Sequence, residues 1–282
     1  MICYLCKSPN FLTRDGAVRD NPSLKIMECA YCGLVMLDSF QHINADHYAD
    51  SGMHGDNDSL SIESWLKQVE QDDQRRIEML KASIVNRRLL DFGCGAAGFV
   101  RKAQSIAAEV VGVEPERRVR EYWGDKVEIY DSLESAGNGY DLITAFHVIE
   151  HLPDPLMILK ELAARLNAKG RLVIEVPSSD DALLTLYHND AFQRFSYWSQ
   201  HLYLFNGETL RQLANQAELR VVSVQQFQRY PLSNHLHWLS RNQPGGHQHW
   251  SFIDALALTE AYAASLAALG KCHTIIAHLE NK

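Results

Sequence analysis

The segment LLDFGCGAAGFV, residues 89–100, restricts the fold more than any other part of this sequence. Apolar residues run into Asp91, and Gly93, Gly95 and Gly98 follow with the spacing G-x-G-x-x-G. This pattern predicts a β-strand, a tight turn where the backbone can approach a ligand closely, and the start of a helix. The Lys-Ser/Thr pair of a phosphate-binding loop is missing, so that kind of nucleotide site is excluded.

Strand and helix patterns alternate on both sides of this turn. A helix is predicted over residues 64–84, where apolar residues recur largely at helical spacing. Asp154 and Pro155 mark the beginning of a later helix that is predicted to reach Gly170. The predicted strands include RRLLDFG, EVVGVEPE, KVEIYD, YDLITAFH and RLVIEVPSS. Strands rich in Val, Ile and Leu that are separated by helices indicate an α/β fold with a parallel sheet covered on both faces.

Four of the six cysteines lie close together in the first part of the sequence, as Cys3, Cys6, Cys29 and Cys32. Two C-x2-C pairs at this separation are typical of a structural zinc site, in which four thiolates fill the coordination sphere and leave no open position for catalysis. A segment as short as residues 1–38 cannot bury a stable core unaided. Disulfide bonds and redox activity are the alternatives. We predict a small zinc-ribbon-like module and a reducing, cytoplasmic setting.

The overall charge argues against some classes of partner. The chain has 282 residues and a formal net charge of −8, which argues against a large nucleic-acid-binding face. It contains no apolar run long enough to span a membrane, and its first residues have no signal-peptide pattern. The sequence does not determine an oligomeric state.

Two later segments give the glycine turn a more specific meaning. Glu114 ends the strand of VVGVEPE, where a carboxylate can accept hydrogen bonds from both hydroxyls of a ribose. Residues 140–155 read YDLITAFHVIEHLPDP, and GRLVIEVPS follows. With the glycine turn, these segments resemble the class I S-adenosylmethionine-dependent methyltransferases, in particular their UbiG-like and sugar-methyltransferase branch. The resemblance covers about residues 86–225.

This resemblance implies a Rossmann-like, doubly wound, seven-stranded sheet whose last two strands form an antiparallel pair. It implies a methyltransferase domain over residues 87–282, with a substrate-binding insertion at about 228–270. Residues 39–86 would supply a linker or lid and then the first helix. Tyr48 and His54 in that linker are candidates for closing over the cofactor.

The same resemblance assigns residues to S-adenosylmethionine. Asp91, Gly93 and Gly95 would face its methionine part, and the missing side chains of the glycines would allow close approach of the backbone. Glu114 would hold the ribose. The remaining candidates are Asp131 near the adenine, and Phe146 and His147 at the border between cofactor and acceptor.

A hydroxyl or carbon acceptor also needs a general base, most often a histidine. Our first candidate is His201 in FSYWSQHLYLF, which resembles the Glu-His pair of sugar C-methyltransferases except that Gln200 replaces the acid. His147 is the second candidate. Aromatic and imidazole side chains suit a polar acceptor, and the residues predicted to bind it are Tyr197, Tyr203, His235, His237 and Trp238.

The predicted function is methyl transfer from S-adenosylmethionine to a small polar acceptor. A sugar or glycan hydroxyl is favoured over carbon or nitrogen acceptors. One alternative is an RNA- or protein-directed methyltransferase that docks through its zinc module. Another is a non-enzymatic, zinc-dependent binding protein. The G-x-G-x-x-G run alone would also suit an NAD-dependent oxidoreductase.

His147, Glu150 and His151 match the zinc-protease pattern H-x-x-E-H. That motif needs a long helix on which both histidines share one face, and here the proline-containing sequence LPDP follows at once. A protease is therefore disfavoured. His151 and Asp154 are expected instead to orient the turn between strand and helix.

Overall fold

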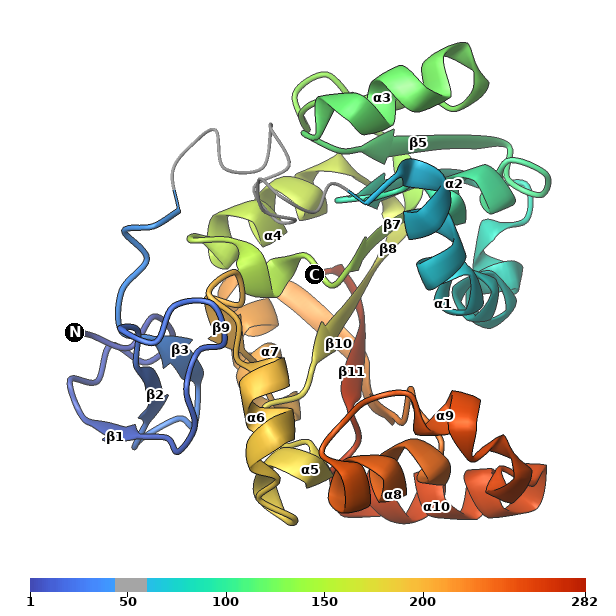
Figure 1. Cartoon of the computed structure of the whole chain (residues 1–282). Helices are drawn as coiled ribbons and strands as arrows, with labels where there is room; N and C mark the ends of the chain where they lie inside the picture. The colour runs from blue at the N-terminus through green and yellow to red at the C-terminus, as the bar shows by residue number, and fades with distance from the viewer. Residues whose placement is uncertain (44–59) are drawn as a thin grey trace.

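The computed structural model of this chain describes residues 1–43 and 60–282, and these form two β-sheets (Figure 1). The larger sheet lies at the centre of the molecule, and the smaller sheet contains the cysteine-rich N-terminal segment. Tyr48 and His54, which the sequence suggested as parts of a lid, lie outside the described residues.

The central sheet confirms the predicted doubly wound architecture. Its strands are β4 Arg88–Phe92, β5 Glu109–Val113, β6 Ile129–Tyr130, β7 Tyr140–Phe146, β8 Leu166–Pro177, β10 Leu219–Phe227 and β11 Thr274–Asn281. The seven strands lie in the order β10-β11-β8-β7-β4-β5-β6, and the run from β8 to β6 is parallel. β11 is antiparallel to both neighbours, as expected. The strand order reverses between β4 and β7, which is where such sheets bind ligands.

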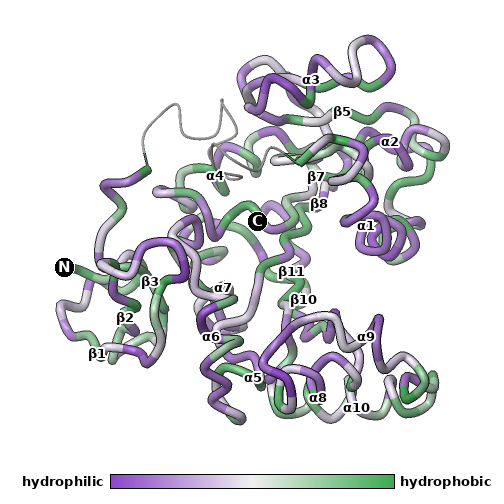
Figure 2. The backbone as a smooth tube through the Cα atoms, viewed as in Figure 1, coloured by the Kyte–Doolittle hydropathy of each residue, from purple (hydrophilic) through white to green (hydrophobic). Residues whose placement is uncertain are grey.

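Helices cover both faces of this sheet because neighbouring residues of a strand point to opposite sides. These helices are α1 Ile62–Ile84, α2 Gly98–Ala103, α3 Arg117–Trp123, α4 Pro155–Arg165 and α7 Gly207–Gln216. Leu89 belongs to the same hydrophobic cluster as side chains of α1, α2 and α3, whereas Leu90 belongs to the cluster that contains side chains of α4 and α7. Figure 2 shows that α1 and α3 carry many hydrophilic residues, as expected for helices with one face in solvent.

Helix α4 begins as predicted and ends earlier. The Asp154 carboxylate accepts a hydrogen bond from the Met157 N–H at 3.1 Å, and Pro155 is the first helical residue. The helix ends at Arg165 rather than near Gly170, because Leu166 already pairs with Tyr140 in the sheet. The register then shifts before Arg171 pairs with Leu142, so the intervening residues form an irregularity within β8.

The N-terminal sheet incorporates a strand from much later in the chain. Its own strands are β1 Phe11–Thr13, β2 Ile26–Cys29 and β3 Val35–Leu37. β9, Tyr203–Leu204, pairs with β3 and completes the sheet. The N-terminal segment is therefore attached to the methyltransferase-like part by main-chain hydrogen bonds.

The remaining α-helices lie near the end of β10 and the beginning of β11 (Figure 1). They are α5 Ala182–Thr185, α6 Asp190–Ser196, α8 Leu232–Arg241, α9 Gly246–His249 and α10 Leu256–Ala268. The last three lie in the predicted insertion at about residues 228–270. Among the described residues, none of the helices combines the length and apolar character needed to cross a bilayer.

Candidate functional site

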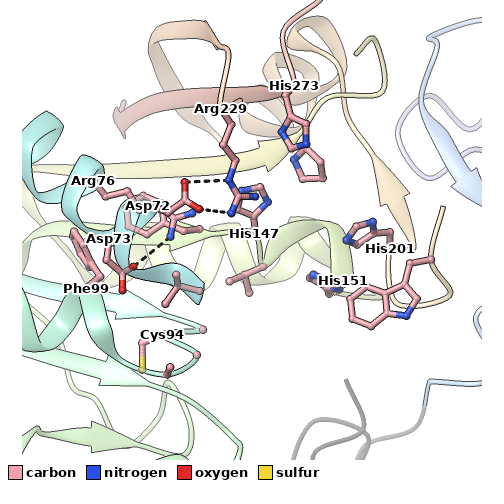
Figure 3. A pocket seen from close by; sticks show the side chains of 18 of the residues that line it. Asp72, Asp73, Arg76, Cys94, Phe99, His147, His151, His201, Arg229 and His273 are labelled. Carbon is pink, nitrogen blue, oxygen red and sulfur yellow. Dashed lines mark hydrogen bonds and ion pairs between the residues drawn. The ribbon is translucent and has the colours of Figure 1, made fainter. Parts of the chain in front are cut away.

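A cavity of about 500 Å³ opens at the carboxyl ends of β4, β5, β7 and β8. This is the edge at which doubly wound sheets bind ligands. The cavity has two parts. One part is bounded by the glycine turn and α1, and the other by histidines and by aromatic residues of the 192–198 region. Figure 3 shows Asp73 and Arg76 on one side of the cavity and His151 and His201 on the other.

The glycine turn forms one wall of the cavity. Gly93 and Gly95 have φ values of +69° and +52°, which glycine adopts readily. A Cβ at Gly93 would lie 2.4 Å from a methyl carbon of Val148, and a Cβ at Gly95 would lie 3.0 Å from the Trp65 ring. Both positions therefore favour glycine, and both leave main-chain atoms at the cavity surface.

Glu114 lies at the end of β5 with its carboxylate held in place. Its two oxygens accept hydrogen bonds from the backbone N–H groups of Gly95 at 2.8 Å and Glu116 at 3.0 Å. Burial raises the pKa of Glu114 to about 7, although these hydrogen bonds oppose the shift. Each oxygen retains a second lone pair, so this carboxylate can still accept from the hydroxyls of a ligand.

Three further predicted cofactor residues, Asp91, Phe146 and His147, border the cavity, and Asp131 does not. Asp91 accepts a hydrogen bond from Thr144 Oγ1 at 2.6 Å, and burial raises its pKa to about 7. Phe146 lies at the end of β7, and both side chains contribute to the wall. Asp131 is exposed and lies outside the cavity-lining set, because β6 ends at Tyr130 and the chain turns away after it.

Helix α1 supplies cavity residues that the sequence analysis did not select. Asp73 and Arg76 are buried charged residues on this helix, and both border the cavity with Trp65. Arg76 Nη2 lies 2.9 Å from Glu175 Oε1, and its guanidinium carbon lies 4.4 Å from the centre of the Phe146 ring. The signal was available, because these charges fall on the same helical face as the apolar residues.

His147 lies between two buried carboxylates at the end of β7. Its Nδ1 is 3.3 Å from Glu150 Oε1, and its Nε2 is 3.2 Å from Glu175 Oε1. Burial lowers the pKa of His147, but the two carboxylates outweigh this effect and hold the pKa above its ordinary value. A histidine with a raised pKa tends to carry a proton already, so it is a poor proton acceptor.

His201 has the opposite electrostatic character. Burial and the neighbouring His151 lower its pKa to about 3, so the ring is neutral at physiological pH. Its Nδ1 lies 3.1 Å from the Ser196 carbonyl oxygen, which can only accept, so Nδ1 carries the hydrogen. The lone pair therefore resides on Nε2. The pattern repeats at His151, whose Nδ1 donates to the Gln200 carbonyl at 2.8 Å.

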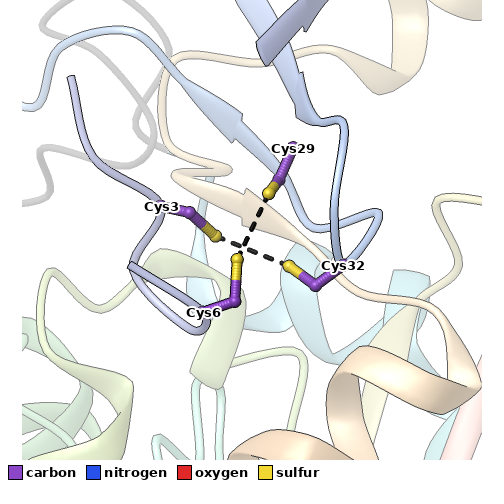
Figure 4. A group of neighbouring side chains, drawn as sticks. All are labelled: Cys3, Cys6, Cys29 and Cys32. Atoms are coloured by element: carbon purple, nitrogen blue, oxygen red, sulfur yellow. Dashed lines mark hydrogen bonds between the residues drawn. The ribbon is translucent and has the colours of Figure 1, made fainter. Parts of the chain in front are cut away.

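Two groups of side chains in the described residues have the donor atoms for a metal. The four thiols of Cys3, Cys6, Cys29 and Cys32 converge, with all sulfur atoms within 4.8 Å of one another (Figure 4). Sulfur separations of 3.4 and 3.5 Å are close to the edge of about 3.8 Å for a tetrahedral zinc–thiolate site and far from a disulfide bond. The donor set thus fits zinc. The second group comprises Glu150, His151 and His201.

The predicted acceptor-binding residues lie elsewhere. None of Tyr197, Tyr203, His235, His237 and Trp238 is among the cavity-lining residues. Tyr203 is part of β9, and Trp238 packs against Phe192 and Phe195. His235 and His237 on α8 hydrogen-bond to Tyr262 and to the Gln243 carbonyl. Tyr197 is buried against Gly16. Packing thus uses the aromatic residues that composition alone suggested for binding.

Other residues line the part of the cavity that contains the histidines. Phe192, Phe195 and Trp198 bring their rings from α6 and the segment that follows it. Arg229, Tyr230 and His273 come from the chain around β10 and β11. Both oxygens of Asp72 bind Arg229, as Figure 3 shows. No local pattern in the sequence indicates this grouping, because these segments meet only through the sheet order.

Asp181 adds a buried carboxyl group to this part of the wall. Its Oδ1 accepts the Leu183 N–H at 2.6 Å and caps α5, whereas Oδ2 has no hydrogen-bond partner among the described residues. Burial raises the pKa of Asp181 to about 7. Between about pH 4 and pH 7 the Asp181 carboxyl is therefore protonated in the folded state and ionised in the unfolded chain, where its pKa is near 3.9. Stability should fall as the pH rises from about 4 to about 7.

Asp181→Asn should remove this loss of stability. Asparagine keeps the capping oxygen and carries no charge, so the free energy of unfolding should rise by about 1–3 kcal/mol at pH 8 and should change less between pH 4 and pH 8. Urea unfolding of the variant and of the control Asp180→Asn at several pH values measures both effects. An unchanged pH dependence in Asp181→Asn would show that this carboxyl is not the source.

The fold and the family can be compared with known proteins. A family model described as a methyltransferase domain matches residues 65–224. Ubiquinone biosynthesis O-methyltransferases are similar over a shorter stretch. That of Bordetella avium is 30% identical over 108 residues, which is 33% of this chain and 44% of the relative. That of Bradyrhizobium diazoefficiens is 30% identical over 101 residues, which is 31% of this chain and 38% of the relative. The chain thus spans less than half the length of these relatives.

Solved structures share the fold at low sequence identity. A SAM-dependent methyltransferase from Archaeoglobus fulgidus is 18% identical and superposes with a TM-score of 0.55 over 79% of this chain and 100% of its own. A SAM-dependent methyltransferase from Thermotoga maritima is described as a possible histamine N-methyltransferase. It is 18% identical and superposes with a TM-score of 0.51 over 78% of this chain and 94% of its own. These likenesses agree with the predicted fold class.

Proposed function

Because this chain belongs to the methyltransferase domain family, we propose that it transfers the methyl group of S-adenosylmethionine to a hydroxyl group of a small polar acceptor. The observation that best supports this proposal is one cavity that joins the glycine turn and Glu114 to a neutral histidine, His201. Such a cavity can hold a methyl donor and an acceptor side by side.

The residues of the cofactor part fit S-adenosylmethionine. Burial raises the pKa of Asp73 to about 6, and those of Asp91 and Glu114 to about 7. A cationic ligand would relieve this cost, and the cofactor carries an ammonium and a sulfonium charge. Glu114 would hold the ribose, and Gly93 and Gly95 would admit the methionine part. When bound, the cofactor supplies an electrophilic methyl group.

Glu114→Ala should weaken the binding of S-adenosylmethionine and its demethylated product by about tenfold to a hundredfold, because two charge-assisted hydrogen bonds are lost. Calorimetric titration measures the affinities. Glu128→Ala, on the exposed surface near β6, is a matched control that should bind normally. Unchanged affinity in Glu114→Ala would remove the ribose assignment. Binding of NAD by the wild type in place of both ligands would refute the proposed reaction class.

His201 is the proposed base in the acceptor part. Its Nδ1–H is fixed by the Ser196 carbonyl, so Nε2 is the atom that can take the hydroxyl proton. Because a pKa of about 3 makes the imidazole a weak base, proton transfer depends on the carboxylate of Glu150, which lies close enough to stabilise the imidazolium ion that results. The rest of the contribution is alignment and the exclusion of water, since methyl transfer is an in-line displacement.

The lining favours an acceptor with a flat apolar face. Rings of Phe192, Trp198 and Tyr230 lie beside polar groups in the acceptor part, and this mixture suits a sugar that stacks through its carbon face. The same flat walls suit a phenol, which is the second candidate. Oxygen is the proposed methylated atom, because a hydroxyl acceptor needs a general base such as His201, whereas a neutral amine does not.

The cysteine group is proposed to hold structural zinc, because four sulfur donors converge at suitable separations. All six cysteines are free thiols, which agrees with a reducing, cytoplasmic compartment as the proposed location. The zinc would stabilise the N-terminal sheet rather than take part in methyl transfer.

An acceptor screen tests the proposed function directly. The purified protein is incubated with S-adenosylmethionine carrying an isotopically labelled methyl group and with separate panels of sugars, sugar phosphates, phenols, RNA and protein. Mass spectrometry of the products identifies the methylated atom. A labelled methyl ether on a small molecule is the expected product. Label in RNA or protein alone would replace this proposal with the macromolecular alternative.

A further inference from the structure

The N-terminal module contacts the segment that carries the proposed base. We call residues 197–202, which include His201, the histidine loop. The backbone N–H of Arg19 donates to the Tyr197 carbonyl at 2.9 Å. The Asp20 carboxylate accepts hydrogen bonds from the Ser199 N–H at 3.0 Å and its hydroxyl at 2.7 Å. The histidine loop is irregular, so these contacts with the module help to determine its conformation.

Arg19 also borders the cavity with its side chain. Its Nη1 donates to the Phe195 carbonyl at 3.2 Å, and its guanidinium carbon lies 4.6 Å from the centre of the Trp198 ring. These contacts orient the guanidinium group. The residue is exposed, so it occupies the mouth of the cavity rather than its interior.

The other cationic side chains that line the cavity are matched by carboxylates. Arg76 pairs with Glu175, and Arg229 pairs with Asp72. The third is His147, which lies between Glu150 and Glu175. Their charges are therefore compensated within the protein.

Arg19 differs from these groups. Among the described residues, no carboxylate lies within ion-pair distance of its guanidinium group: the adjacent Asp20 interacts with Arg19 only at longer range, and its oxygens accept hydrogen bonds from Ser199. One donor is used by the Phe195 carbonyl, which leaves further N–H donors of a planar, permanently charged group at the cavity mouth. A guanidinium group with spare donors matches the oxygen pairs of carboxylates and phosphates.

We propose that Arg19 binds an oxyanion of the acceptor, so that the N-terminal module supplies a specificity-determining residue to the acceptor site. The acceptor is then a small hydroxylated compound with a carboxylate or phosphate group, its hydroxyl near His201 and its anionic group at the mouth. This inference rests on the proposed function for the identity of the site as an acceptor site. The oxyanion site itself can be tested without any methyl transfer.

The test uses the full-length protein and two probes, inorganic phosphate and benzoate, titrated at constant ionic strength and followed by calorimetry and by the melting temperature. Binding of at least one probe is expected, and Arg19→Gln should weaken it about tenfold or more. Arg19→Lys keeps the charge and loses the planar donors, so its affinity for the probe should lie between those of the wild type and of Arg19→Gln. Arg194→Gln on α6 removes a nearby exposed arginine outside the cavity lining and should bind as the wild type does.

The two probes distinguish the possible anions. Preference for phosphate would indicate a phosphorylated acceptor, and preference for benzoate a carboxylate beside an apolar ring. No binding of either probe to the wild type, or equal binding by Arg19→Gln, would overturn the proposal. Titrations with and without the demethylated cofactor keep the two hypotheses separate, because a protein that fails to bind the cofactor can still bind the oxyanion.

Discussion

Replacing His201 with alanine should lower the turnover number by a factor of about 10²–10⁴ and leave cofactor affinity unchanged, because the variant loses the general base and no cofactor contact. Rates are measured with the acceptor identified in the screen, and affinity by calorimetry with the demethylated product. Since the pKa of His201 is about 3, its protonation should not reduce the rate between pH 8 and pH 5. A general base with an ordinary pKa of about 6.5 would lose activity in that range.

His273→Ala is the matched control for this prediction. His273 is another buried histidine of the cavity wall whose pKa is held well below its ordinary value, and its Nδ1 lies 2.9 Å from Thr274 Oγ1. A similar loss in both variants would point to a general effect of altering the cavity rather than to base catalysis. Normal turnover in His201→Ala would move the base to His147, whose raised pKa predicts that the rate falls with decreasing pH sooner than it would with an ordinary histidine.

The parts of this molecule that sequence predicted are those with a local signal. The glycine turn at Gly93 and Gly95 and the carboxylate of Glu114 follow from short-range patterns, since a strand end, a tight turn and a helix start each restrict their own residues. The alternation of strands and helices then limits the sheet to a doubly wound form. The cysteine spacing likewise indicates the convergence of four thiols that the structure contains.

The parts that sequence could not give depend on contacts between distant segments. Arg19 meets Trp198 only because β9 joins the N-terminal sheet, and a two-residue strand such as Tyr203–Leu204 has no periodicity to detect. The charged face of α1 was detectable in principle, because Asp73 and Arg76 interrupt an apolar stripe. Trp238, which was predicted to bind the acceptor, is buried and lies outside the cavity lining; an aromatic residue in a polar segment can pack as well as bind, and the sequence alone does not distinguish the two.

The largest effect on stability should come from the cysteine group. Cys29→Ser should abolish zinc binding and lower the free energy of unfolding by several kcal/mol, because metal binding supplies folding energy to so small a sheet. For a chain of this size that corresponds to a fall in melting temperature of about 10 °C. Metal analysis and calorimetric melting measure the two quantities. Cys272→Ala, at a buried thiol outside the group, should retain the metal.

The position of this sheet makes the same variant informative about the acceptor site. β3 pairs with β9, and the Leu37 N–H donates to the Leu202 carbonyl at 3.0 Å, next to His201. Loss of the metal should therefore disturb the histidine loop and lower turnover, whereas the glycine turn and Glu114 belong to the central sheet and should bind the cofactor as before. A wild-type protein that is metal-free and fully folded would refute the zinc site. Full turnover in a metal-free variant would show that the histidine loop needs no support from the module.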